Sequence, residues 1–141
     1  MTSPEDSAPS IRGRSDRKAG EAEASVTAYA QAALDALPLE YATKVHNVEF
    51  SIEATLTAEE GQRLGIRPGS LYGLYEGIPL TRRGSGYNHV SPDRITVYWG
   101  PLVRDYQNDG TLEDKVRKVV YHEIGHYFGL SETDLAHTRV R

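Results

Sequence analysis

Apolar residues recur with a helical period near the start of this 141-residue chain. Between about Glu21 and Leu37 they lie three or four positions apart in an alanine-rich background, at Val26, Tyr29, Ala33 and Leu37. The pattern stops before Pro38, which cannot continue a helix. It predicts an amphipathic helix that backs a sheet.

Residues 45–56 alternate instead with a period of two, which predicts a strand with one wet face. Thr57 and Glu60 form a capping box that opens a short helix, and Gly65 can close it. Two further strands are predicted at residues 71–76 and 94–99. The segment between them is rich in Gly, Pro and Asn and predicts a loop.

The last long helix is predicted to begin after Thr111, which can cap it, and to end at Gly129, which can adopt the left-handed conformation. Glu113 and Asp114 lie in its first turn, where the helix dipole favours acidic side chains. One face forms an apolar stripe of Leu112, Val116, Val119, Val120, Ile124, Tyr127 and Phe128. This stripe should pack against the rest of the domain.

The same helix carries the sequence His122-Glu123-Ile124-Gly125-His126. Residues four apart on a helix lie on one face about one turn apart, so both imidazoles can reach one metal ion. The two histidines flank the apolar stripe, and Glu123 projects into it, where a carboxylate without a partner is costly. The spacing therefore predicts a metal site with a carboxylate beside it.

A solvated helix face that carries two histidines by chance is the alternative. The following residues favour the metal, because they extend the match to HExxHxxGxxE and Gly129 lets the backbone turn back toward the ion. Glu132 is the first candidate for the third ligand, Asp134 is the second and His137 is the third.

Composition narrows the chemistry further. The chain has no cysteine, so a metal must be held by imidazole and carboxylate. Its 20 acidic and 16 basic residues are mixed along the sequence and give a net charge of -4, so neither nucleic acid nor an anionic lipid surface is an expected partner.

Residues 1–20 hold one large aliphatic side chain, Ile11, and predict a flexible tail ahead of a single domain over residues 21–141. The first 17 residues contain no apolar run of signal-peptide length, and nowhere do 18 apolar residues occur together. The expected location is therefore the cytoplasm.

Three segments resemble the minimal zincins, a family of bacterial possible zinc metallopeptidases. They are Leu74-Tyr-Glu-Gly-Ile-Pro-Leu80, Pro92-Asp-Arg-Ile-Thr-Val97 and His122-Glu-Ile-Gly-His-Tyr-Phe-Gly-Leu-Ser131. The resemblance spans about residues 36–135 and implies a compact α+β, zincin-like fold, in which a small mixed sheet packs on a backing helix and an active-site helix. It also implies Zn²⁺ bound by His122, His126 and a residue past Gly129. The family commonly has Asp where this chain has Glu132, so Asp134 stays open as the third ligand.

A catalytic zinc would have three protein ligands and a water, with Glu123 as the general base in hydrolysis of a peptide bond. Zincins commonly bind substrate as an extra strand, and residues 94–99 are the expected sheet edge because they precede the active-site helix and end near Pro101. Tyr98 could supply a transition-state donor from that strand. Tyr87 and His89 could lie over the site.

Two other functions fit the same sequence. In a non-catalytic zinc protein, a fourth side chain such as His89 or Asp134 closes the coordination shell. A metal-free interaction module is the other possibility. The substrate of an enzyme and the oligomeric state do not follow from the sequence.

Overall fold

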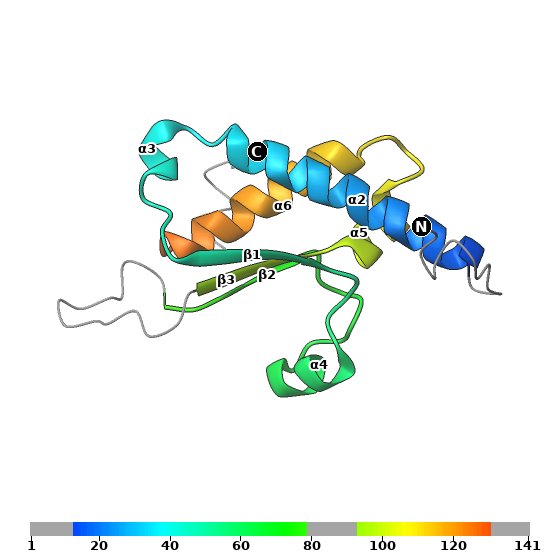
Figure 1. Cartoon of the computed structure of the whole chain (residues 1–141). Coiled ribbons are helices and arrows are strands. Elements are labelled where there is room, and N and C mark those ends of the chain that lie inside the picture. The colour runs from blue at the N-terminus through cyan, green and yellow to red at the C-terminus, as the bar shows by residue number, and fades with distance from the viewer. Residues whose placement is uncertain (1–12, 79–92, 131–141) are drawn as a thin grey trace, which may run out of the picture.

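A computed structural model describes residues 13–78 and 93–130 of the chain. Helices and strands follow one another in the order α2 (Gly13–Asp35), α3 (Leu39–Ala42), β1 (Val48–Glu53), α4 (Ala58–Leu64), β2 (Gly73–Glu76), β3 (Asp93–Tyr98), α5 (Trp99–Tyr106) and α6 (Leu112–Tyr127). The long helices α2 and α6 lie across one face of the sheet, and α4 lies beyond its other face (Figure 1). This mixed α+β architecture confirms the predicted fold class.

The sheet has the strand order β1-β3-β2, so β3 is its central strand. β3 pairs with β1 in parallel and with β2 in an antiparallel register. The prediction that residues 94–99 form the sheet edge is therefore wrong. Every residue of β3 except Arg94 is buried, as expected for a strand covered on both faces. The strand at the edge beside α6 is β2 instead.

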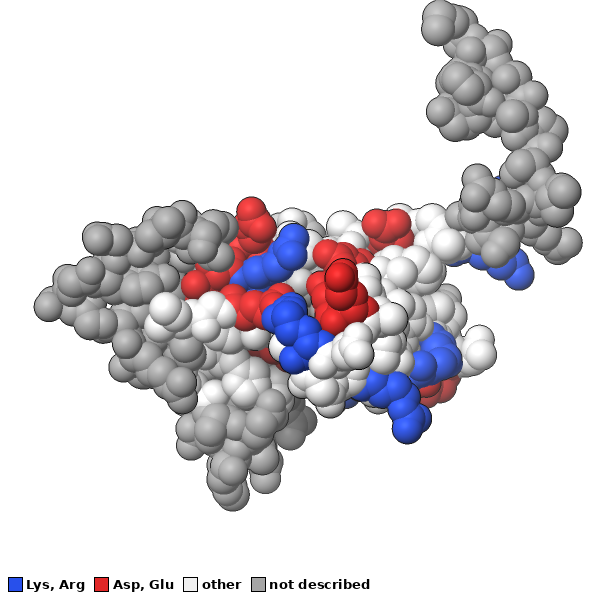
Figure 2. Space-filling model, turned by 90° about the horizontal axis from the view of Figure 1, so that it is seen from below, with Lys and Arg blue, Asp and Glu red and all other residues white. Residues whose placement is uncertain are grey.

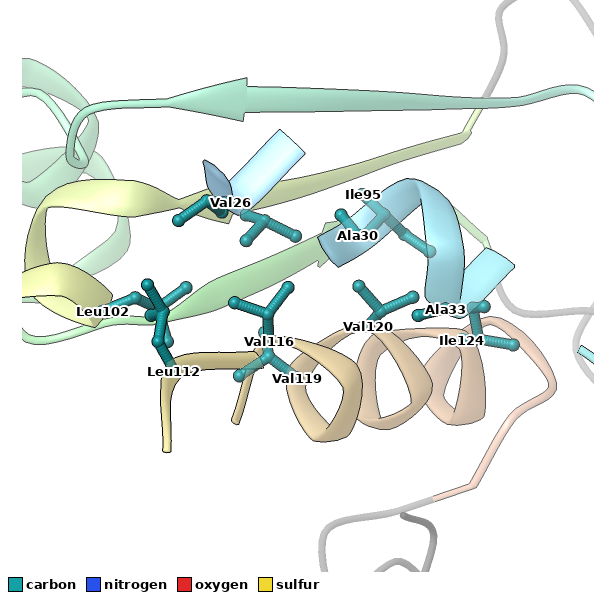
Figure 3. Packing of buried hydrophobic residues seen from close by; sticks show 11 residues of the cluster. Val26, Ala30, Ala33, Ile95, Leu102, Leu112, Val116, Val119, Val120 and Ile124 are labelled. Atoms are coloured by element: carbon teal, nitrogen blue, oxygen red, sulfur yellow. The ribbon is translucent and has the colours of Figure 1, made fainter. Parts of the chain in front are cut away.

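The core lies between α2, α6 and the sheet. Small and branched side chains meet there: Val26, Ala30 and Ala33 of α2, Ile95 of β3, and Val116, Val120 and Ile124 of α6 (Figure 3). A hydrogen bond also links the two helices: the Tyr121 hydroxyl of α6 donates to the Ala33 carbonyl oxygen of α2 at 2.9 Å. The predicted backing helix and the predicted stripe of the last helix thus pack on each other.

The start of α2 differs from the prediction, and α5 was not predicted. α2 begins at Gly13 rather than near Glu21, so residues 13–20 of the predicted tail are helical. No side chain described ahead of Val26 is buried, which explains why no apolar periodicity marked these turns. Trp99 begins α5 rather than ending a strand, and Pro101 lies in the first turn of α5, where a missing N–H costs nothing.

The face of the sheet opposite α2 and α6 carries α4, whose predicted capping box between Thr57 and Glu60 is present. Gly65 ends this helix with a φ of 72°, also as predicted. Acidic and basic side chains lie side by side on this face (Figure 2). Arg63 and Glu76 form an ion pair at 3.4 Å. The view shows no extended surface of one charge.

Gly73 brings α6 close to the edge strand. A Cβ atom built on Gly73 would lie 2.7 Å from Cγ1 of Val119 and 3.2 Å from Cγ of Glu123. A distance of 2.7 Å is far below van der Waals contact, so any side chain at this position would push the helix away. The glycine therefore sets the separation between β2 and the helix that carries the histidine motif.

Replacing Gly73 with Ala should destabilise the fold by about 1–3 kcal/mol, because the buried Val119 side chain cannot move aside freely. Urea unfolding of the two proteins measures the difference. The matched control is Gly20→Ala in α2, where an added Cβ meets nothing within 4 Å. That change should be neutral or stabilise the helix by up to about 1 kcal/mol. Equal stability of Gly73→Ala and wild type would contradict the close contact.

Candidate metal centre and active-site cleft

A cleft of about 850 Å³ lies between α6 and the edge strand β2. Residues 70–75 line it from the strand side. From α6 it is lined by Lys115, Lys118, Val119, His122, Glu123 and His126. His122, Glu123 and His126 of the predicted site therefore face one cleft, next to the backbone of an edge strand.

The imidazoles of His122 and His126 lie together in this cleft. Their ring centroids are 4.9 Å apart and their planes are inclined by 80°. Both side chains are partly buried. Two rings in this relation can direct one nitrogen each to a common ion, as the four-residue spacing predicts.

The tautomer of His126 follows from its hydrogen bond. Its Nδ1 lies 3.0 Å from the carbonyl oxygen of Leu130. A carbonyl oxygen only accepts, so Nδ1 must carry the proton and donate it. In the neutral ring, this leaves the lone pair of Nε2 for a metal.

The turn that supplies this carbonyl is built by Gly129, which has a φ of 93°. The Leu130 N–H donates to the Gly125 carbonyl and the Gly129 N–H to the His126 carbonyl, at 3.0 and 2.9 Å. These two bonds are those of a Schellman motif. The predicted left-handed end of the helix is thereby confirmed, and the same turn fixes the orientation of His126.

Glu123 is 8% exposed and belongs to the buried face of α6, as predicted. Its Cγ lies where the missing side chain of Gly73 leaves room. The carboxylate thus combines a mostly dry surrounding with access to the cleft.

At the start of α6, Thr111 is the N-cap residue, but its side chain makes no capping bond. Its hydroxyl and its backbone N–H both donate to Oδ1 of Asp109, at 2.5 and 3.1 Å. Glu113 and Asp114 lie in the first turn as predicted. The sequence therefore located the helix start correctly and missed which side chain supports it.

Several predicted site residues lie outside the described part of the chain: Glu132, Asp134, His137, Tyr87 and His89. Within residues 13–78 and 93–130, no three ligating side chains cluster around one point. The described candidate ligands are the imidazoles of His122 and His126, and the Leu130 carbonyl orients the ring of His126. They fit zinc, which accepts imidazole nitrogen with carboxylate oxygen as a further ligand.

Tyr98 does not lie at the site. It is 2% exposed and is not among the residues lining the cleft. Burial, followed by the nearby charges of Glu60 and Glu53, raises the pKa of its phenol to about 12. Within the described residues, the tyrosines that line the cleft are Tyr72, just before β2, and Tyr75, within it. Sequence reasoning missed them because it placed the edge at the wrong strand.

The sequence model of the zincin-like metallopeptidase family matches residues 45–140. The chain belongs to this family. The match covers the sheet, the cleft and the histidine motif, and it confirms the resemblance of the three sequence segments. A search of the curated proteins finds no match. Among the described helices of this zincin-like chain, none has the length and apolarity needed to cross a membrane.

Replacing Gly129 with Val should destabilise the protein by about 1 kcal/mol or more and weaken metal binding, since a β-branched residue tolerates a positive φ poorly. Urea unfolding and zinc titration measure the two effects. Gly65→Val is the matched control, because Gly65 also has a positive φ but ends α4 on the far side of the sheet. It should lose comparable stability and keep its zinc affinity. Unchanged zinc affinity in Gly129→Val would contradict the role of this turn.

Proposed function

We propose that this member of the zincin-like metallopeptidase family is a zinc-dependent peptidase that hydrolyses a peptide bond in the cleft between α6 and β2. The observation that carries the proposal is the convergence of His122, Glu123 and His126 on a cleft bordered by a strand edge. His122, His126 and Glu132 would hold the zinc. Asp134 is the alternative third ligand.

Zinc supplies Lewis-acid chemistry, in which it lowers the pKa of a water and polarises the peptide carbonyl. Two features of this chain prepare the site for it. The Leu130 carbonyl keeps the proton of His126 on Nδ1, and the left-handed Gly129 ends α6 in a turn. Both support a ligand set that spans the end of the helix.

Glu123 is the proposed general base. Its carboxylate accepts a proton from the water as the water oxygen attacks the peptide carbonyl carbon, and it then gives this proton to the leaving amine nitrogen as the C–N bond breaks. Its burial supports this role, because a carboxylate in a mostly dry surrounding has few competing waters. Being next to His122 in the sequence, it would lie beside a bound metal without being one of its ligands.

The substrate would be an extended peptide. β2 is paired with β3 on one side, and within the described residues no strand covers its other side. A strand edge offers unpaired N–H and C=O groups that an extended peptide can pair with. The backbone of β2 would therefore hold the substrate beside Glu123.

Protein purified without chelator should contain about one Zn²⁺ per chain, and His122→Ala or His126→Ala should abolish tight binding. Metal analysis after dialysis against a weak chelator measures this. His46→Ala removes an exposed histidine that does not line the cleft and should keep the metal. Wild-type zinc content in either cleft variant would show that the site is elsewhere, and four protein ligands around the zinc would favour a structural metal.

Glu123→Gln should keep the fold and the zinc but lose about 10²-fold or more in peptide hydrolysis, since the amide cannot accept the proton. Cleavage of a peptide library by the zinc-loaded protein identifies a substrate, on which both proteins are then compared. Equal rates would rule out Glu123 as the base. A wild type that cleaves nothing in the library would contradict the peptidase itself.

A further inference from the structure

Two lysines line the cleft on the N-terminal side of the histidines. Lys115 and Lys118 precede His122 by seven and four positions on α6, so all three share the face of the helix that borders the cleft. The proposed reaction uses neither of them. Their chemistry suits a negatively charged group of a bound peptide.

The two lysines differ in their partners. Lys118 forms an ion pair with Asp114 at 2.8 Å, which offsets its charge. Within the described residues, Lys115 pairs with no carboxylate. Its Nζ lies instead over two aromatic rings, 5.0 Å from the ring centroid of Tyr72 and 5.3 Å from that of Tyr106. Lys115 therefore brings to the cleft a positive charge that none of the described acidic side chains neutralises.

The two rings that support Lys115 are themselves fixed. The Tyr72 hydroxyl donates to Oδ2 of Asp105 at 2.6 Å, and Arg104 binds the same carboxylate at 2.8 and 2.9 Å. The bond to Asp105 also raises the pKa of Tyr72 well above its ordinary value, so its ring stays neutral. Tyr106 meets Tyr72 edge to face at 5.5 Å. This arrangement orders the ammonium group before any ligand arrives.

The direction of a bound peptide follows from the neighbours of β2. Lys115 lies by Tyr72, Glu123 by Gly73, and Tyr127 by Tyr75, so α6 and β2 run in the same sense. A peptide pairing with β2 in the more stable antiparallel sense therefore has its C-terminal end at Lys115. Seven helical residues span about 10 Å, which is the length of about three residues of extended peptide.

We propose that Lys115 is the specificity-determining residue of the cleft: it binds a carboxylate of the peptide about three residues beyond the scissile bond on the C-terminal side. This inference rests on the proposed function. The carboxylate belongs either to an Asp or Glu side chain or to the free C-terminus of the peptide. Both present the same charge to Nζ, and the experiment separates them.

The probes are mixed-sequence peptide pools that carry Glu or Gln at a defined position after a variable segment, each with a free or an amidated C-terminus. For the zinc-loaded protein, kcat/KM should be about 5- to 10-fold higher with the carboxylate than with the matched amide, the scale of one charge-assisted hydrogen bond at a partly exposed site. The preference should shrink as salt rises to about 1 M. A response to Glu identifies the side chain, and a response to the free terminus identifies the main-chain carboxylate.

Lys115→Met keeps the length of the side chain and should remove the preference while the uncharged peptides are still cleaved. Lys115→Glu should reverse the preference, so that pools with Lys at the defined position are cleaved faster than the Glu pools. Lys18→Met, which removes the same charge from an exposed site on α2, should leave it unchanged. An acidic preference that survives Lys115→Met, or one confined to the N-terminal side of the scissile bond, would overturn the proposal.

A binding measurement separates this inference from the proposed function. Fluorescence anisotropy with zinc-loaded Glu123→Gln compares the Glu and Gln pools without any need for turnover. Binding of the Glu pool should be about fivefold tighter and should lose this advantage in Glu123→Gln combined with Lys115→Met. If the wild type cleaves nothing, the peptidase proposal fails while the binding comparison still tests Lys115. Equal binding of the two pools would refute the role of Lys115.

Discussion

Helix α6 has to bury one stripe of side chains while it presents another to a cleft, and the rest of the structure depends on this division. Its branched residues pack on α2 and on the central strand, which fixes the rotation of the helix about its own axis. Once that rotation is fixed, His122 and His126 face the cleft. Glu123 lies on the buried stripe, where it is mostly shielded from solvent.

The close approach of α6 to the sheet edge depends on Gly73, and the end of α6 depends on Gly129. The first glycine removes a side chain that would collide with Val119 and Glu123. The second allows a backbone conformation from which the Leu130 carbonyl reaches the His126 ring. The chain thus positions its candidate catalytic groups through close backbone contacts at two glycines.

Features that depend on neighbouring residues in the chain were predictable from the sequence. The capping box at Thr57, the apolar stripe of the last helix, the left-handed Gly129 and the pairing of His122 with His126 all follow from short-range periodicity and turn chemistry. The order of the strands was not predictable, because an apolar run indicates a buried strand but not which strands pair with it. The apolar run after Arg94 is typical of a central strand. More weight was given to Pro101, which suggested a sheet edge.

The contacts of Lys115 could not be predicted from the sequence for a related reason. Its contacts with Tyr72 depend on β2 lying beside α6, which in turn depends on the strand order. The start of α2 was also hidden, because no side chain described ahead of Val26 is buried. Helical periodicity is visible only where a helix buries a face.

The four-residue length of β2 limits what the proposed peptidase can act on. So short an edge offers few backbone hydrogen bonds, and only an extended chain can pair with it. Natively folded proteins expose few such segments, whereas unfolded or frayed ones expose many. Geometry alone would then confine the proposed peptidase to damaged, nascent or terminal stretches of polypeptide, and it would spare intact folded neighbours.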